Sequence, residues 1–196
     1  MSEPKRHLPH IIQSLKGAWE LIKLNPRGME YFDKSADGFW KSFWVLALGT
    51  PILMLWGYLT YDIAIEKEKT DIIWANIAAY YIMLPLFAIL MVFYTKFIRI
   101  NKYYSQMIIA YNWLSLLTLY IVRSLELVMW TGIFPDRISL TLTIGLMLYF
   151  QLFVTWFIFK HSLKISGILA VGVVIFEFLM SLSVLSLLVR FLNLTS

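Results

Sequence analysis

The sequence predicts an all-α fold: a polytopic membrane helical bundle of five transmembrane helices, with an N-terminal amphipathic interfacial helix. The first observation is composition, because 60% of the 196 residues are hydrophobic, whereas soluble domains stay near half apolar. The second is a set of five apolar runs, each long enough to cross about 30 Å of hydrocarbon at 1.5 Å per residue. The third is that charges stand mostly at the ends of these runs, as is typical of membrane proteins.

The N-terminal segment, residues 1–41, is expected to lie outside the membrane and to contain an amphipathic helix over residues 10–24. Its apolar side chains recur at spacings of three and four, which predicts a single stripe made of Ile11, Ile12, Leu15, Trp19 and Ile22. We expect this helix to lie in the head-group plane, with Trp19, Lys16 and Lys23 as interfacial anchors. The alternative is a helix docked on the rest of the protein or on a partner.

Pro26 and Gly28 are expected to end this helix, because proline disfavours helical geometry in the residue before it and glycine supplies the turn. The aromatic side chains of Trp40 and Trp44 then indicate where the chain enters the bilayer. The second domain, residues 42–192, is expected to hold the five spans at about residues 42–61, 72–95, 103–130, 138–159 and 165–189. Since the connectors are short, one compact bundle is predicted.

The distribution of Lys and Arg predicts the orientation. Seven lie in the N-terminal segment, three follow the second span and two follow the fourth, whereas the other side holds four. Because cytoplasmic loops carry the excess of positive charge, we expect a cytoplasmic N-terminus and an outward C-terminus, in a bacterial cytoplasmic membrane. The lipid bilayer is therefore the expected partner, and no nucleic acid is expected.

Glu177 is the only formally charged residue in the last apolar run. A lone carboxylate near the bilayer midplane is costly, so it is expected to be protonated, paired or facing water. Arg123 in the third span is its predicted ion partner, although Glu126 competes for Arg123 from three residues away. The other structural reading is a neutral acid bonded to Ser181 or to a tyrosine, and a role in proton or solute passage is the alternative function.

Two amides form a second polar set at membrane depth. Asn112 in the third span and Gln151 in the fourth fall at similar depths, which predicts an interhelical hydrogen bond. Small residues on one side of the last span, from Ser166 to Gly172, predict close helix contact and an interior position for that span.

Several classes of function have no support in the sequence. Cysteine is absent, which excludes disulfides, thiolate metal sites and cysteine nucleophiles. There is no HExxH motif, no serine in a GxSxG setting and no phosphate-cradling glycine loop. We therefore expect no catalytic residues, no metal and no cofactor.

Three stretches resemble the YIP family of Ypt/Rab-interacting membrane proteins and their bacterial relatives. They are Asp37–Trp44 where the chain enters the bilayer, Ala110–Trp113 with the sequence AYNW, and the run from Trp156 through KHSLKISG into the last span. The resemblance implies a cytosolic N-terminal segment, five close-set spans and an outward C-terminus. The eukaryotic members' Asp-Leu-Tyr-Gly-Pro sequence before a Phe-Trp pair is absent here, so only architecture is carried over.

The leading functional expectation is a non-enzymatic membrane protein that acts through association with other membrane proteins or with itself. It would serve in membrane organisation or trafficking, or as an accessory subunit of a larger complex. One alternative is a small transporter or channel component that uses Glu177, and another is a lipid-binding or scrambling protein.

Overall fold

The structure is a computed structural model that describes residues 10–61, 67–131, 133 and 135–195. Residues 1–9 of the expected N-terminal segment lie outside this range. The described part is helical, with α1 (His10–Ile22), α2 (Ala36–Ser42), α3 (Trp44–Tyr61), α4 (Lys67–Phe97), α5 (Tyr104–Trp130), α6 (Asp136–Leu148), α7 (Thr155–Leu163) and α8 (Gly167–Thr195). Short 3-10 turns, η1 (Pro26–Glu30) and η2 (Asn101–Tyr103), join some of them, and the π-helical segment η3 (Tyr149–Val154) links α6 to α7. The predicted all-α bundle is confirmed.

Five of the helical stretches are long and apolar enough to cross a membrane, as the sequence predicts. They cover Ala36–Thr60, Ile73–Phe97, Asn101–Met129, Arg137–Leu163 and Gly167–Leu192. The first combines α2 with α3 and the fourth combines α6, η3 and α7. This is the architecture of an integral membrane protein.

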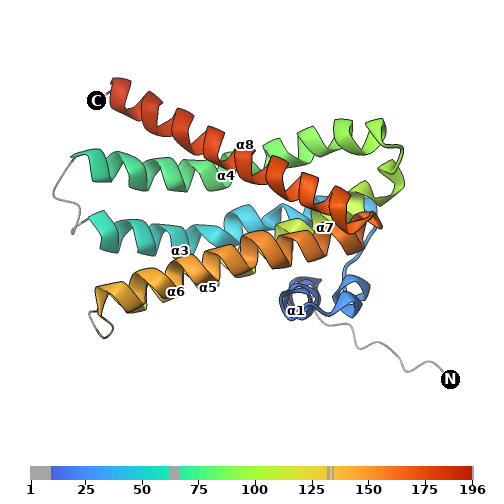
Figure 1. Ribbon diagram of the computed structural model, residues 1–196, viewed down its shortest axis with the longest axis horizontal. Coiled ribbons are helices and arrows are strands. Elements are labelled where there is room, and N and C mark those ends of the chain that lie inside the picture. Colours follow the sequence, from blue (N-terminus) through green and yellow to red (C-terminus); the bar gives the residue numbers. More distant parts are fainter. Residues whose placement is uncertain (1–9, 62–66, 132, 134, 196) are drawn as a thin grey trace.

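The long helices run side by side, and α1 lies across them near one end of the bundle, where Figure 1 shows it almost end-on. We call this the α1 end; α8 finishes at the opposite, far end. Helix α5 is central, because it contacts α1, α2, α3, α4, α6 and α7. Half of the residues in an 18-residue apolar stretch of the α5 span are buried, against 28% in the corresponding stretch of α8.

The expectation that the last span is interior is wrong. Helix α8 packs on α4 and α7, and its outward side chains, such as Ile168, Val171 and Ile175, are exposed. A Cβ added at Gly172 would meet no neighbouring atom within 4 Å. Small residues permit close packing: Ala170 is buried and Gly167 lies against Trp156 of α7, whereas Gly172 faces no other helix of the described residues.

Helix α1 docks on the bundle with a face that overlaps the predicted stripe only in part, since Ile22 is buried and Ile11 and Leu15 are partly buried against the core. Its buried residues are Ser14, Gly17, Ala18, Leu21 and Ile22, while Ile12 and Trp19 are 43% and 51% exposed. The small side chains on the buried face let α1 come close to its neighbours. The docked alternative is therefore what the structure has, and Trp19 points away from the protein.

Gly28 does not make the turn that ends α1. A Cβ on Gly28 would lie 2.6 Å from the carbonyl oxygen of Gly17, so the glycine serves close packing between η1 and α1. The chain instead reverses at Leu24, which has a φ of 58°, and the N–H of Asn25 donates to the carbonyl of Glu20 at 3.0 Å. This is the left-handed helix ending that glycine usually makes.

Candidate functional site

Glu177 belongs to the buried stripe of α8. The stripe repeats at spacings of three and four, so all of its members face the bundle: Ala170, Val173, Val174, Glu177 and Met180. Glu177 is only 6% exposed. Helix α8 lies at the periphery of the bundle, but the Glu177 carboxylate points toward the inside.

Both carboxylate oxygens of Glu177 accept hydrogen bonds from neutral side chains. The Tyr111 hydroxyl on α5 donates to Oε1 at 2.7 Å, and the Gln151 amide donates to Oε2. Gln151 lies in η3, where the wider π turn rotates side chains relative to an α-helix; π segments are frequent at functional sites. The predicted alternative of a tyrosine partner for Glu177 is thus what the structure has.

Aromatic packing holds Tyr111 in place. Its ring centroid lies 4.5 Å from that of Phe87 on α4 and 5.7 Å from that of Phe159 on α7. These three rings are all buried. Because the ring is fixed between two helices, the direction in which its hydroxyl donates is fixed too.

A cavity of about 420 Å³ lies beside Glu177. Helices α4, α5, α6, α7, α8 and segment η3 line it. Its polar lining residues are Tyr80, Tyr111, Ser115, Thr118, Arg123, Gln151, Thr155, Glu177 and Ser181. Its rim includes Met147 and Leu148 of α6 and Phe178 of α8, all three of which are more than 40% exposed. Figure 1 shows α6 and α8 diverging toward the far end from the region where α7 and α8 meet. The cavity is therefore bordered by lipid-facing side chains on one side.

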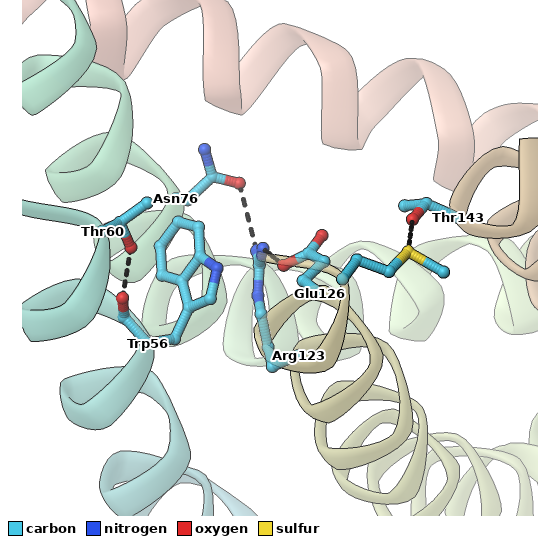
Figure 2. A network of polar contacts seen from close by, with 7 residues as sticks. Trp56, Thr60, Asn76, Arg123, Glu126 and Thr143 are labelled. Carbon is cyan, nitrogen blue, oxygen red and sulfur yellow. Dashed lines mark hydrogen bonds and ion pairs between the residues drawn. The ribbon is translucent and has the colours of Figure 1, made fainter. Parts of the chain in front are cut away.

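The predicted ion pair between Glu177 and Arg123 is wrong. Among the described residues, Arg123 pairs with Glu126, with Nη1 to Oε2 at 2.7 Å, and it also approaches the Asn76 side-chain oxygen at 3.4 Å. Figure 2 shows the guanidinium between these two groups, with the Trp56 indole beside it; the ring centroid is 3.9 Å from the guanidinium carbon. Arg123 and Glu177 line the same cavity, but a partner on the next turn of α5 satisfies Arg123. The competing pair with Glu126 is confirmed.

The predicted hydrogen bond between Asn112 and Gln151 is also wrong. The Asn112 amide donates to the hydroxyl of Ser42, at the end of α2, at 2.9 Å, while Gln151 serves Glu177. Residues 111 and 112 differ by about 100° around a helix, so Asn112 faces α2 while Tyr111 faces the cavity. Equal depth does not imply that two side chains share a face.

The predicted interfacial anchors are on the surface. Trp40 and Trp44 are 70% and 54% exposed, and Trp19 is 51% exposed. Lys16 is exposed, and Lys23 forms an ion pair with Glu20. Their contact with lipid stays a prediction.

Two carboxylates outside the spans have shifted pKa values. Hydrogen bonds from the Lys23 and Asn25 side chains hold the pKa of Glu20 below its usual range. The backbone N–H of Ser35 donates to Asp33 at 3.0 Å and likewise lowers the pKa of Asp33. This bond shapes the turn that leads into α2, where the Ser35 hydroxyl accepts from the N–H of Gly38 at 3.1 Å. Both groups organise the N-terminal segment and lie away from the cavity.

Sequence reasoning missed Tyr111 and the cavity. A signal was present, because Tyr111, Ser115 and Thr118 recur at spacings of four and three in the third span, which predicts that they share one face of the helix. Within the described residues no group of three His, Asp or Glu side chains could hold a metal ion. No family model, no curated protein and no solved structure matches the chain, and the resemblance to the YIP family stays a prediction.

Proposed function

We propose that this is a non-enzymatic integral membrane protein that holds a small molecule in the cavity beside Glu177. It would act as a small transporter, a channel component or a lipid-binding protein. The observation that carries the proposal is a buried carboxylate on the wall of a cavity of about 420 Å³. An ionisable residue inside a membrane is expensive and commonly marks a substrate or ion path. The cavity volume is within the range of small-molecule pockets.

The surroundings of Glu177 support binding over simple bundle locking. Had Arg123 paired with Glu177, both charges would have been used inside the bundle. Instead Arg123 forms an ion pair with Glu126, and Glu177 is hydrogen-bonded to the neutral side chains of Tyr111 and Gln151. The carboxyl group is held in a defined position, and no cation of the described residues forms an ion pair with it.

The test uses the absence of cysteine in the chain. Ser181 lines the cavity, whereas Ser183 lies two positions along α8 and is exposed on its outer side. We would compare the single variants Ser181→Cys and Ser183→Cys, reconstituted in lipid nanodiscs, for their rate of reaction with methyl methanethiosulfonate. Because the thiolate is the reactive form and needs a polar environment, a hydrated cavity makes Ser181→Cys react and leaves Ser183→Cys inert. Equal inertness of the two variants would contradict the proposal.

We propose further that the α1 end faces the cytoplasm of a bacterial cell and that the C-terminus lies outside the cytoplasmic membrane. The excess of Lys and Arg on the side of the N-terminal segment supports this orientation. A reporter fused after Ser196 that is active only in the cytoplasm would be silent in this orientation. A cytoplasmic signal would reverse it.

Association with other membrane proteins, the leading expectation from the sequence, is a second candidate, and we take self-association as its testable form. The feature that favours it is the outer face of α8, where Gly172 has open space beside it, since small residues let membrane helices approach closely. Cysteine introduced at Gly172 should form disulfide-linked dimers in native membranes more efficiently than cysteine at Gly145 of α6, which also faces open space. Equal cross-linking at both positions would contradict this candidate.

A further inference from the structure

The chemistry around Glu177 narrows the class of ligand, and this step rests on the proposed function. Both neighbouring side chains donate to the carboxylate, Tyr111 to one oxygen and Gln151 to the other. An ionised carboxylate only accepts hydrogen bonds, whereas a protonated one must also donate. The ionised form accepts both bonds, whereas in a neutral acid the Tyr111 hydroxyl would accept the carboxyl proton instead.

An ionised carboxylate inside a membrane needs a cation. Arg123 is the cation of the described chain that lines the same cavity, and it is engaged with Glu126 at 2.7 Å. Burying an unbalanced charge is costly. Glu177 is therefore either protonated while the cavity is empty or balanced by a cation that enters the cavity.

The remaining lining groups include hydroxyls and apolar surfaces. The Ser115 hydroxyl donates to the Tyr111 carbonyl at 2.8 Å, so its lone pairs can still accept. An ammonium group has three N–H donors and no acceptor, which fits a carboxylate and the Ser115 hydroxyl oxygen. The aromatic rings of Tyr80, Phe150 and Phe178 line the rest of the cavity together with aliphatic side chains.

The border of the cavity indicates how such a ligand arrives. Met147, Leu148 and Phe178 belong to the rim and are exposed to the surroundings of the bundle, which in a membrane are acyl chains. Helices α6 and α8 diverge on this side. A ligand with an apolar body can pass between them while its polar group reaches Glu177.

We infer that the cavity binds the ammonium group of an amphiphilic primary amine, which enters from the bilayer between α6 and α8 and takes Glu177 as its counter-ion. The amine is either a free alkylamine or the head group of an aminophospholipid. Both sources present the same ammonium donor on an apolar body.

The experiment measures protection of the cavity cysteine. The Ser181→Cys protein is placed in phosphatidylcholine nanodiscs, and its reaction with methyl methanethiosulfonate is followed with octylammonium or with octanol at matched membrane concentrations. Octylammonium should slow labelling about tenfold, the scale of a hydrogen-bonded charge pair, and octanol should not. Protection should vanish when Glu177→Gln is added. This variant should fold, because glutamine keeps the size of glutamate and a hydrogen-bonding oxygen. A melting curve from circular dichroism checks that it does.

A second arm identifies the source of the amine. Nanodiscs that contain phosphatidylethanolamine should protect Ser181→Cys without added amine if the lipid head group is the ligand, and native mass spectrometry should then show that lipid retained. If only octylammonium protects, a free amine is the ligand. Equal protection by octanol, protection that survives Glu177→Gln, or no protection by either amine overturns the inference. Since Ser181→Cys would still react in those cases, the proposed function would stand; it fails if Ser181→Cys never reacts.

Discussion

The pair between Arg123 and Glu126 should be a point of high sensitivity. The two side chains are each 15% exposed, and Nη1 lies 2.7 Å from Oε2. At an effective dielectric constant of about 20, a separation of about 3 Å gives a gross Coulomb attraction of about 6 kcal/mol. Desolvation costs several kcal/mol per ion and offsets most of it. The net contribution of the intact pair is therefore small, but removing one partner leaves the other charge uncompensated.

We expect Glu126→Gln to lower the free energy of unfolding by about 3 kcal/mol, because Arg123 then keeps its charge, and its remaining partners among the described residues are the Asn76 oxygen and the Trp56 ring. The double variant Arg123→Leu with Glu126→Leu should lose less than the single one, since no lone charge remains. Reversible unfolding by sodium dodecyl sulfate in mixed micelles, followed by circular dichroism, measures both.

The matched control is the exposed pair between Lys41 and Asp37, in which the Asp37 side chain is 65% exposed. Asp37→Asn should change stability by at most about 1 kcal/mol, as for other surface pairs. The reasoning is refuted if Glu126→Gln costs no more than this control, or if the double variant is the least stable of the set.

Four further substitutions test other contacts. Tyr111→Phe should cost about 1 to 2 kcal/mol in the same unfolding assay, because Oε1 of Glu177 loses its donor; no loss would mean that the hydroxyl is not bound there. Gly28→Ala should cost about 1 to 3 kcal/mol by overpacking, whereas Gly172→Ala, which meets open space, should be neutral or slightly stabilising; the reverse order would contradict the packing. The folded-state pKa of Asp33 is lowered, so its contribution is present above a pH of about 4 and is lost as pH falls through the folded pKa. Asp33→Asn should flatten that part of a stability-against-pH curve, and an unchanged curve would exclude the group.

The bundle itself could be predicted from hydropathy, because backbone groups in lipid must be satisfied within each segment and a long apolar run has few alternatives to a helix. Local pairs were equally accessible: Arg123 and Glu126 lie three residues apart, and on a helix such residues are neighbours. The helix endings at Leu24, Arg99 and Lys164 could not be predicted in this way. All three residues have a positive φ, but none of them is a glycine.

The sequence by itself determined how many membrane-length helices form and how deep each polar residue lies, because rise per residue is constant. Only the tertiary structure decided which way each helix turns about its axis. Because of that rotation, Glu177 accepts hydrogen bonds from Tyr111 and Gln151 and does not pair with Arg123. Rotation also turns Asn112 toward Ser42, and packing sets α8 at the edge of the bundle. The physical reason is that depth is a one-dimensional property of the chain, whereas rotation depends on the side-chain packing of neighbouring helices, and the cavity beside Glu177 exists only through that packing.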